Sequence, residues 1–263
     1  MTFILPTFGG GVIASPAAPT PAFNTYSVQF DGTNDYGQSS YVASSSATAL
    51  SYSFWMKSSN TTSAMTFGVS DATPSTTKSF RLLGHPTSKN FFVIISDGTG
   101  NYVNASLPSS ITGTYNVRDD LWHHMVLTVN GTSFKAYIDG GDAPINASNT
   151  SNSEGTAFTA TSTKSYSGGS DNYVVGRNGS NNGYYFDGLL DEVAIFEKEL
   201  SSSEARAIYN GGVPADLSSY SPNIWWRMGD NDGGTGTTIT DQGSESQNLT
   251  LTNGPTFSTT VPS

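Results

Sequence analysis

Two neighbouring carboxylates, Asp191 and Glu192, lie inside the apolar run LLDEVAIF, and their residue types could supply an acid and a base. A retaining glycosidase holds two carboxyl groups about 5–5.5 Å apart across its sugar. Successive side chains of an extended strand point to opposite faces of the sheet, so neighbouring positions do not provide that pair. We therefore expect no catalytic site here and predict that the chain is not an enzyme.

Calcium binding is the second chemistry that carboxylates could perform. Ca²⁺ takes six to eight oxygen ligands from carboxylates, carbonyls and water. Asp31 precedes Gly32 in a predicted turn and Asp191 lies in a predicted strand, so a compact fold could bring the two together as ligands. The alternative is that each carboxylate accepts hydrogen bonds from backbone amides. The sequence leaves both open, and Ca²⁺ is the one cofactor that it suggests.

The histidines do not predict a metal centre. The chain has three histidines and no cysteine, so a site of imidazole and thiolate ligands lacks its donors. His123 and His124 follow Trp122 at the start of a predicted strand. We expect both to be structural residues at a strand edge.

The charge balance excludes one class of partner. The chain has 21 Asp and Glu against 11 Lys and Arg, a formal net charge of -10. Such a surface repels phosphate backbones, so we expect no nucleic-acid partner. No window is long and apolar enough to span a bilayer, so we expect no membrane span.

The elements that position these residues show a period of two, which predicts strands. In YSVQFDG, Val28 and Phe30 share one face. In SYSFWMKS, Tyr52, Phe54 and Met56 share one face and alternate with Ser51, Ser53 and Trp55. The segments YVVGRN and LLDEVAIF continue the pattern. Short strands separated by turn signals predict a sandwich or barrel.

Paired Asx-Gly dipeptides predict the hairpins. Asp97-Gly98 separates two predicted strands, Asn130-Gly131 lies at the tip of a second hairpin, and Asp139-Gly140 closes its far end. A two-residue loop of type I′ needs positive φ at both positions, which Asn, Asp and Gly tolerate best. Residues 140–172 are polar and rich in turn residues, and we expect a long surface loop there.

One segment, SSSEARAIYNGG, predicts a helix of about two turns. Ser201 and Glu204 form a capping box, and Ala205 and Ile208 follow at helical spacing. Gly211 stands where a helix usually ends in the left-handed conformation.

Several segments, in this order, resemble a known family: YSVQFDGTNDY, SFWMK, LWHHMVLTVNGTSFKAYIDGG, YVVGRN and FDGLLDEVAIFEKELSSSEARAIYNGG. They are similar to the laminin G-like, concanavalin A-like jelly rolls and their pentraxin relatives, over about residues 24–212. The resemblance implies an all-β, concanavalin A-like jelly-roll β-sandwich of two antiparallel sheets with one short helix and an extended N-terminal arm. Relatives often bind calcium. The sequence as a whole, apart from any single motif, also resembles structural proteins of marine bacteriophages.

The chain is therefore expected to form one laminin G-like β-sandwich over residues 24–263, with residues 222–263 completing or extending it. Trp225 and Trp226 in that last segment must point to opposite faces. Residues 1–23 carry no charged side chain and are expected to form an N-terminal arm that docks on other virion proteins or neighbouring subunits; the alternative is a flexible tail or linker. Its apolar residues are Phe3, Ile4, Leu5, Phe8, Val12 and Ile13.

Sugar recognition is predicted at GRNGSNNGYYF. Exposed aromatic rings beside hydrogen-bonding side chains bind sugars in β-sandwiches, and this segment offers Asn181, Asn182, Tyr184 and Tyr185. The alternative is that one tyrosine packs inward while its neighbour merely faces solvent.

Two functions remain. In the first, the chain is a non-catalytic virion structural protein on the particle surface, a phage head decoration or fibre subunit whose lectin-like sandwich contacts host glycans. The alternative is a cell-surface or secreted carbohydrate-binding lectin-like module. The first 25 residues lack the basic region of a secretory signal, which favours the virion surface.

Overall fold

The computed structural model describes residues 24–41, 43–44, 47, 49–61, 65–69, 78–84, 90–97, 101–109, 113–130, 133–143, 146–152, 173–177 and 183–263. The predicted arm, residues 1–23, lies outside the described residues.

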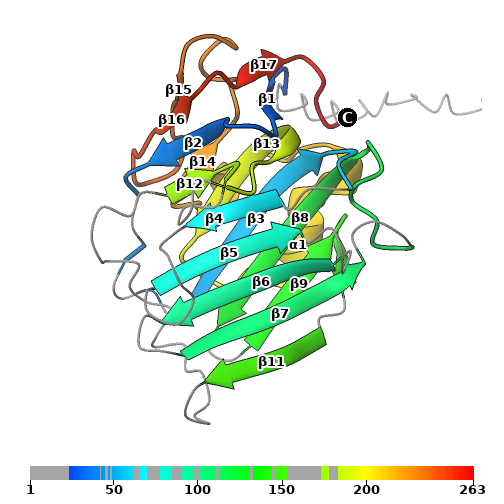
Figure 1. Ribbon diagram of the computed structural model, residues 1–263. Coiled ribbons are helices and arrows are strands. Elements are labelled where there is room, and N and C mark those ends of the chain that lie inside the picture. Colours follow the sequence, from blue (N-terminus) through cyan, green and yellow to red (C-terminus); the bar gives the residue numbers. More distant parts are fainter. Residues whose placement is uncertain are drawn as a thin grey trace, which may run out of the picture.

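The largest sheet has eight antiparallel strands (Figure 1). Seven of them follow one path: β10 (Gly141–Ala143), β9 (Ser133–Ile138), β8 (Trp122–Asn130), β3 (Ala49–Lys57), β13 (Asp187–Phe196), β1 (Ser27–Asp31) and β17 (Thr256–Ser258). The eighth, β14 (Ile224–Trp226), pairs with β13. Strands from the two ends of the described fold, β1 and β17, are thus neighbours.

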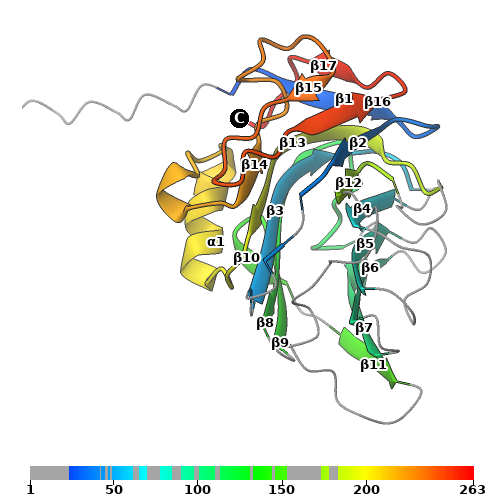
Figure 2. The same cartoon turned by 90° about the vertical axis from the view of Figure 1, so that its left-hand side faces the viewer.

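A five-stranded antiparallel sheet lies across from this large sheet (Figure 2). Its order is β11 (Asn146–Asn152), β7 (Asn101–Ser109), β6 (Asn90–Asp97), β5 (Lys78–Gly84) and β4 (Met65–Val69). A four-stranded sheet closes one end of the molecule with β12 (Tyr173–Val175), β2 (Tyr36–Ser39), β16 (Leu249–Thr252) and β15 (Thr238–Ile239). The predicted all-β sandwich of two antiparallel sheets is confirmed, with this third, smaller sheet as an addition.

The period-two alternation places the core on the inner face of the large sheet, the side that faces the five-stranded sheet. Aliphatic and aromatic side chains alternate inward along its strands and pack into one cluster, because burying them removes apolar surface from water. The strand members of that cluster include Val28, Phe30, Tyr52, Phe54, Met56, Met125, Leu127, Val129, Leu190, Val193 and Ile195.

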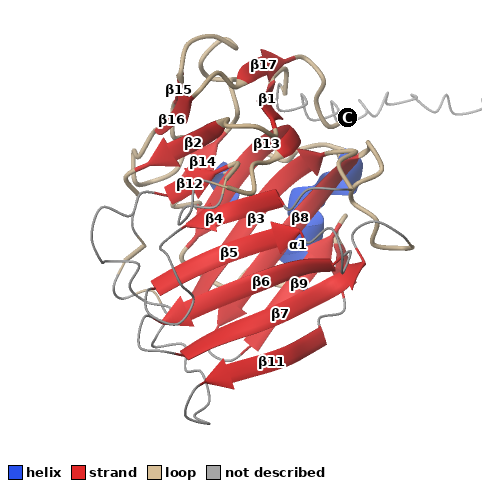
Figure 3. Ribbon diagram, in the orientation of Figure 1, coloured by secondary structure: helices blue, strands red, loops and turns tan. Residues whose placement is uncertain are grey.

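The outer face of the large sheet is covered by α1 (Ser202–Tyr209), the single α-helix among the described residues (Figures 2 and 3). The Ser201–Glu204 capping box is present, as predicted. The left-handed residue that ends the helix is Asn210, one position before the predicted Gly211, although Gly211 also has a positive φ. Two short 3₁₀ turns follow, Asn210–Gly212 (η2) and Ser218–Tyr220 (η3).

The two neighbouring tryptophans divide between the two faces, as predicted. Trp226 is fully buried in the inner core. Trp225 packs in the outer cluster with Ile208 of α1. Residues 222–263 contribute β14 to the large sheet, β15 and β16 to the four-stranded sheet, and β17 beside β1.

Two expectations about the chain path were wrong. Residues 146–152, predicted as part of a long surface loop, form β11 and pair antiparallel with β7. The segment NASNTSN has no apolar alternation, and its strand is defined by backbone pairing at the edge of its sheet. His123 and His124 lie on β8, which runs between β9 and β3 and is not an edge strand.

Among the residues that the structure describes, no helix has both the length and the apolar character needed to cross a membrane.

Candidate functional site

Asp191 and Glu192 both lie on the outer face of the large sheet, which corrects the expectation that they point to opposite faces. The reason is a β-bulge in β13, where two residues lie between Asp191 and Ala194 while a single residue separates their partners Trp55 and Ser53 on β3. Glu192 is the residue with positive φ, at 48°. The extra residue breaks the two-residue period, so neighbouring side chains share a face.

These carboxylates belong to a buried polar network. The Asn24 side-chain amide donates to Asp191 Oδ2 at 3.0 Å, and the Glu192 amide donates to Asp191 Oδ1 at 2.8 Å. Trp225 Nε1 and Arg227 Nε donate to the two oxygens of Glu192. Arg227 also donates through Nη2 to Asp230 Oδ2 at 3.0 Å.

The network contains three carboxylates against one guanidinium, and their pKa values respond to that imbalance. Burial raises the pKa of Asp191 well above its ordinary value, and the neighbouring Glu192 charge adds to the rise. Burial raises the pKa of Glu192 to about 7, although the Arg227 charge opposes the shift. Burial also raises the pKa of Asp230, against hydrogen bonds from the amides of Thr25 and Tyr26.

The carboxylates of Asp191 and Glu192 can bind protons, but their burial keeps a substrate out of contact with them. Asp191 is 0% exposed and Glu192 is 4% exposed. Each carboxylate is engaged by donors of the protein itself. Proton transfer to a ligand requires hydrogen-bond reach, which such burial denies.

The candidate calcium ligands do not form a site together. Asp31 pairs with Asp187 across β1 and β13, and Asp191 lies four residues further, about 13 Å along the strand. Asp31 Oδ1 accepts hydrogen bonds from the amides of Thr33 and Asn34 at 2.8 and 3.2 Å, the turn-capping alternative. No group of three or more His, Cys, Asp or Glu residues in the described part of the chain could hold a metal ion. Calcium does not fit these residues.

Tyr184 is one of two large apolar side chains that stand out from the described surface, with 49% of its area exposed. Its φ is 57°, a left-handed value that a bulky residue rarely adopts. Tyr185 is partly buried, and Phe186 turns inward to meet the Phe30 ring edge-on at 6.0 Å. Tyr184 therefore points outward from a segment anchored by its neighbour.

Two backbone hydrogen bonds fix this segment to the rest of the sandwich. The Phe186 amide donates to the Gly176 carbonyl at 2.8 Å, and the Gly32 amide donates to the Phe186 carbonyl at 2.9 Å. Phe186, two residues after Tyr184, thus lies beside Gly176, the neighbour of Arg177, and beside Gly32, the neighbour of Thr33.

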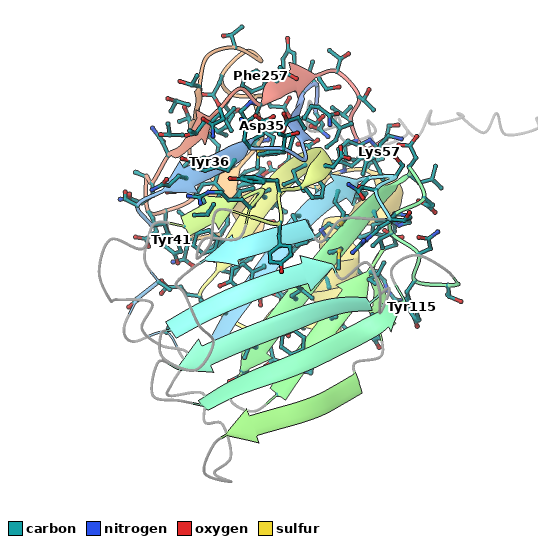
Figure 4. The ribbon with its side chains drawn as sticks, viewed as in Figure 1. Asp35, Tyr36, Tyr41, Lys57, Tyr115 and Phe257 are labelled. Carbon is teal, nitrogen blue, oxygen red and sulfur yellow. The ribbon has the colours of Figure 1, made fainter. Side chains whose placement is uncertain are left out.

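Polar groups complete this surface. The Arg177 guanidinium lies 4.0 Å from the centre of the Tyr36 ring, and Asp35 and Tyr36 lie beside each other near the four-stranded sheet (Figure 4). Thr33 and Asn34 are exposed in the preceding turn. We call Thr33, Asn34, Tyr36, Arg177 and Tyr184 the tyrosine rim. An aromatic face with hydrogen-bonding neighbours is the composition of a small-ligand site.

Of the five residues of the tyrosine rim, the sequence prediction named one, Tyr184. Tyr184 and Tyr185 are placed as described above, whereas Asn181 and Asn182 lie outside the described residues. The apolar residues predicted for docking of the arm also lie outside them: Phe3, Ile4, Leu5, Phe8, Val12 and Ile13. Arg177 and Tyr36 were missed, since their proximity depends on strand pairing between β12 and β2.

The two neighbouring histidines have different environments. His123 is held between Asp139, 2.8 Å from Nδ1, and Asp119, 3.0 Å from Nε2. His124 is 1% exposed, lies 2.9 Å from Ser53 Oγ and packs against the rings of Trp55 and Tyr209, which also contact each other. Both have structural partners.

Comparison with known proteins connects this fold to a family. A family model described as the concanavalin A-like lectin/glucanases superfamily matches residues 31–206. No curated protein matches the chain.

Three solved structures are similar to this chain. A putative carbohydrate binding protein from Bacteroides ovatus ATCC 8483 is 16% identical with a TM-score of 0.57, covering 90% of this chain and 61% of that chain. The full-length tailspike protein 2 from Escherichia coli O157:H7 bacteriophage CAB120 is 12% identical with a TM-score of 0.51, covering 76% and 26%. Domains LG4-5 of the mouse laminin alpha1 chain are 14% identical with a TM-score of 0.45, covering 69% and 44%. The chain therefore spans about three fifths of the first of these proteins and about a quarter of the second.

Proposed function

The chain belongs to the concanavalin A-like lectin/glucanases superfamily, and on that basis we propose that it is a non-catalytic carbohydrate-binding module with its site at the tyrosine rim. The resemblance read from the sequence is thereby confirmed. The superfamily includes both lectins and glucanases, so the choice between binding and hydrolysis depends on the residues of this chain.

The observation that carries the proposal is the conformation of Tyr184. A left-handed φ at a bulky residue costs about 1–3 kcal/mol and persists where the surrounding structure enforces it. Here the enforced conformation presents a half-exposed ring to solvent instead of burying it. Such strain clusters at active sites, ligand clamps and switch regions. A sugar ring would stack on Tyr184 and form hydrogen bonds with Thr33, Asn34 and Arg177.

The buried carboxylates support the absence of catalysis. Asp191 and Glu192 are the closest carboxylate pair in sequence on β13, and neither reaches the surface. Their hydrogen bonds to Asn24, Trp225 and Arg227 are those of a structural network. We therefore propose that the module binds its sugar without cleaving it.

A pair of variants at one position tests the rim. Tyr184→Gly removes the ring and relieves the left-handed strain, so folding is preserved while binding is lost. Tyr184→Phe retains the ring and serves as the matched control. Each protein is applied to a printed array of plant, bacterial and animal glycans, and its thermal midpoint is recorded. Binding retained by the Phe variant and lost by the Gly variant supports the site. Equal binding by the Gly variant, or no glycan bound by the unaltered chain, overturns it.

We further propose that the module is carried on the surface of a phage particle. The uncharged residues 1–23, rich in apolar side chains, support this placement because they would dock on neighbouring subunits. The alternative is a cell-surface or secreted lectin-like module. Mass measurement and electron imaging of the natively isolated chain, with and without residues 1–23, discriminate between them. A chain that occupies regular positions on a particle only when it carries residues 1–23 supports docking, and a free monomer in both cases contradicts it.

A further inference from the structure

We propose a second ligand site, specific for an uncharged sugar ring, in a groove on the helix side of the large sheet. The groove has a volume of about 590 Å³ and lies between β9, β10 and the start of α1. Figure 2 shows α1 on the side of the large sheet that faces away from the five-stranded sheet. Its lining residues that carry polar side chains are Lys135, Tyr137, Asp142, Ser201 and Ser202. We call these five residues the helix-side groove.

Strand register explains why the polar groups converge. Tyr137 of β9 lies directly opposite Asp142 of β10. Lys135 lies two residues before Tyr137, so both side chains leave the same face of the sheet. That face is the outer one, because Tyr137 packs in the cluster beneath α1. Ser201 and Ser202, at the helix start, supply the facing wall.

Tyr137 supplies the most specific evidence for a ligand. The residue is 4% exposed and lines the groove. Within the described residues its hydroxyl forms no hydrogen bond with the protein, and the hydroxyl oxygen is not fully enclosed, so it is open to the groove. A hydroxyl that the protein leaves unpaired at the wall of a groove is available to bind a ligand in place of water. A ligand in the groove would supply that partner.

The charges select an uncharged ligand. Lys135 is neutralised by Glu199, whose Oε1 lies 2.6 Å from its ammonium. Asp142 is exposed and its carboxylate has no hydrogen bond within the described part of the chain. The local sum of one cation and two carboxylates disfavours an anion such as a phosphate or an acidic sugar.

A pyranose ring fits the remaining chemistry. Neighbouring hydroxyls of a sugar donate to both oxygens of one carboxylate, which Asp142 presents. The Tyr137 and Ser202 hydroxyls donate to or accept from the next positions of the ring. A volume near 590 Å³ accommodates a ligand of this size.

This inference does not rest on the tyrosine rim, because the two surfaces share no residue. If both surfaces bind sugar, one module contacts a polysaccharide at two places. A polysaccharide long enough to reach both surfaces then binds more tightly, because the second contact forms at a high effective concentration.

The test uses the full chain carrying Tyr184→Gly, so that the rim no longer contributes. Glucose, galactose, mannose and N-acetylglucosamine are titrated and observed by saturation-transfer NMR, with N-acetylneuraminate as the anionic probe. In that background, Tyr137→Phe and Asp142→Asn each weaken neutral-sugar binding about tenfold, the effect of one lost hydrogen bond in a desolvated site. Tyr220→Phe is the matched control, because Tyr220 packs against the same outer cluster without lining the groove.

Each outcome of this experiment either supports or overturns sugar binding in the helix-side groove. Neutral-sugar binding that survives Tyr184→Gly and falls with Tyr137→Phe and Asp142→Asn, at unchanged thermal midpoints, establishes the groove whether or not the rim binds. Binding that disappears with Tyr184→Gly alone places it at the rim and overturns the groove. A preference for N-acetylneuraminate, or no binding of any neutral sugar, overturns the ligand class or the site.

Discussion

Arg227 Nε donates a hydrogen bond to Glu192 Oε1 at 3.0 Å, and this pair joins β13 to the segment that follows β14. Glu192 is 4% exposed, and the Arg227 side chain retains 15% of its exposure. Removing the guanidinium leaves two buried carboxylates, Glu192 and Asp230, without their cation. We expect Arg227→Met to lower the free energy of unfolding by about 3 kcal/mol at pH 7, measured by urea denaturation.

Adding Glu192→Gln to Arg227→Met is the control for this prediction. The amide carries no charge, so the double variant should recover much of the lost stability. A double variant no more stable than Arg227→Met alone would show that the guanidinium acts through packing on Trp225, whose ring lies 5.3 Å away.

The Asp191–Glu192–Asp230 network makes stability depend on pH in an unusual direction. The pKa of Glu192 is raised to about 7, mainly by burial, from an ordinary value near 4.5. Between pH 4.5 and 7 the folded state therefore binds a proton that the unfolded state has released. Its contribution to stability falls as pH rises through this window. Asp191 and Asp230 shift in the same direction.

Glu192→Gln should therefore flatten the pH dependence of the urea midpoint between pH 4.5 and 7. The reference is the unaltered chain under the same conditions. Identical slopes for both proteins would contradict the shifted titration of Glu192.

The neighbouring histidines should titrate far apart. Burial lowers the pKa of His123, but its hydrogen bonds to Asp139 and Asp119 outweigh this and raise the pKa above its usual value. Burial lowers the pKa of His124 to about 3. NMR of the imidazole carbons should show one midpoint above 6.5 and one ring that stays neutral down to about pH 4. Two midpoints near 6.5 would refute the assigned environments.

The raised pKa of His123 has a consequence for stability. Its ion pairs contribute fully below pH 6.5, and this contribution is lost as pH rises through the folded pKa. His123→Gln should accordingly cost more stability at pH 5.5 than at pH 9, in paired thermal unfolding experiments. A loss of stability that is the same at both pH values would show that His123 acts through packing and not through its charge.

Gly188 should tolerate no side chain. Its φ is 149°, and a Cβ there would overlap the carbonyl oxygen of Lys57 on β3. We expect Gly188→Ala to cost about 3 kcal/mol, from backbone strain and the clash together. Gly113→Ala is the matched control, because Gly113 has φ 83° and nothing within 4 Å of the added carbon. Equal costs would show that the contact with Lys57 does not matter.

Much of this architecture could be predicted from the sequence, because the large sheet follows local rules. Tyr52, Phe54 and Met56 alternate into the core, and Ser201 with Glu204 begins the helix, since period and capping are properties of a few neighbouring residues.

The candidate sites were harder to predict, because they depend on departures from those rules. Nothing in LLDEVAIF distinguishes a bulge at Glu192 from a regular strand, so the two carboxylates were assigned to opposite faces although both lie on one. Tyr184 was found from its residue type, whereas its conformation and the anchoring of the following Phe186 beside Gly176 and Gly32 depend on the pairing of distant segments. The groove around Tyr137 arises from register between β9 and β10, which spacing alone does not define.

The pairing of β1 with β17 determines how this domain bears mechanical load. Ser27 lies opposite Ser258, and Ser27 Oγ donates to the Thr260 carbonyl at 2.8 Å. The chain preceding Ser27 and the chain following Ser258 therefore leave the sheet at the same end of one antiparallel pair. Tension between those two segments opens the pair one hydrogen bond at a time, like a zipper. Tension between the N-terminal segment and a ligand held elsewhere on the sandwich would be spread over the bonds of β1 with β13.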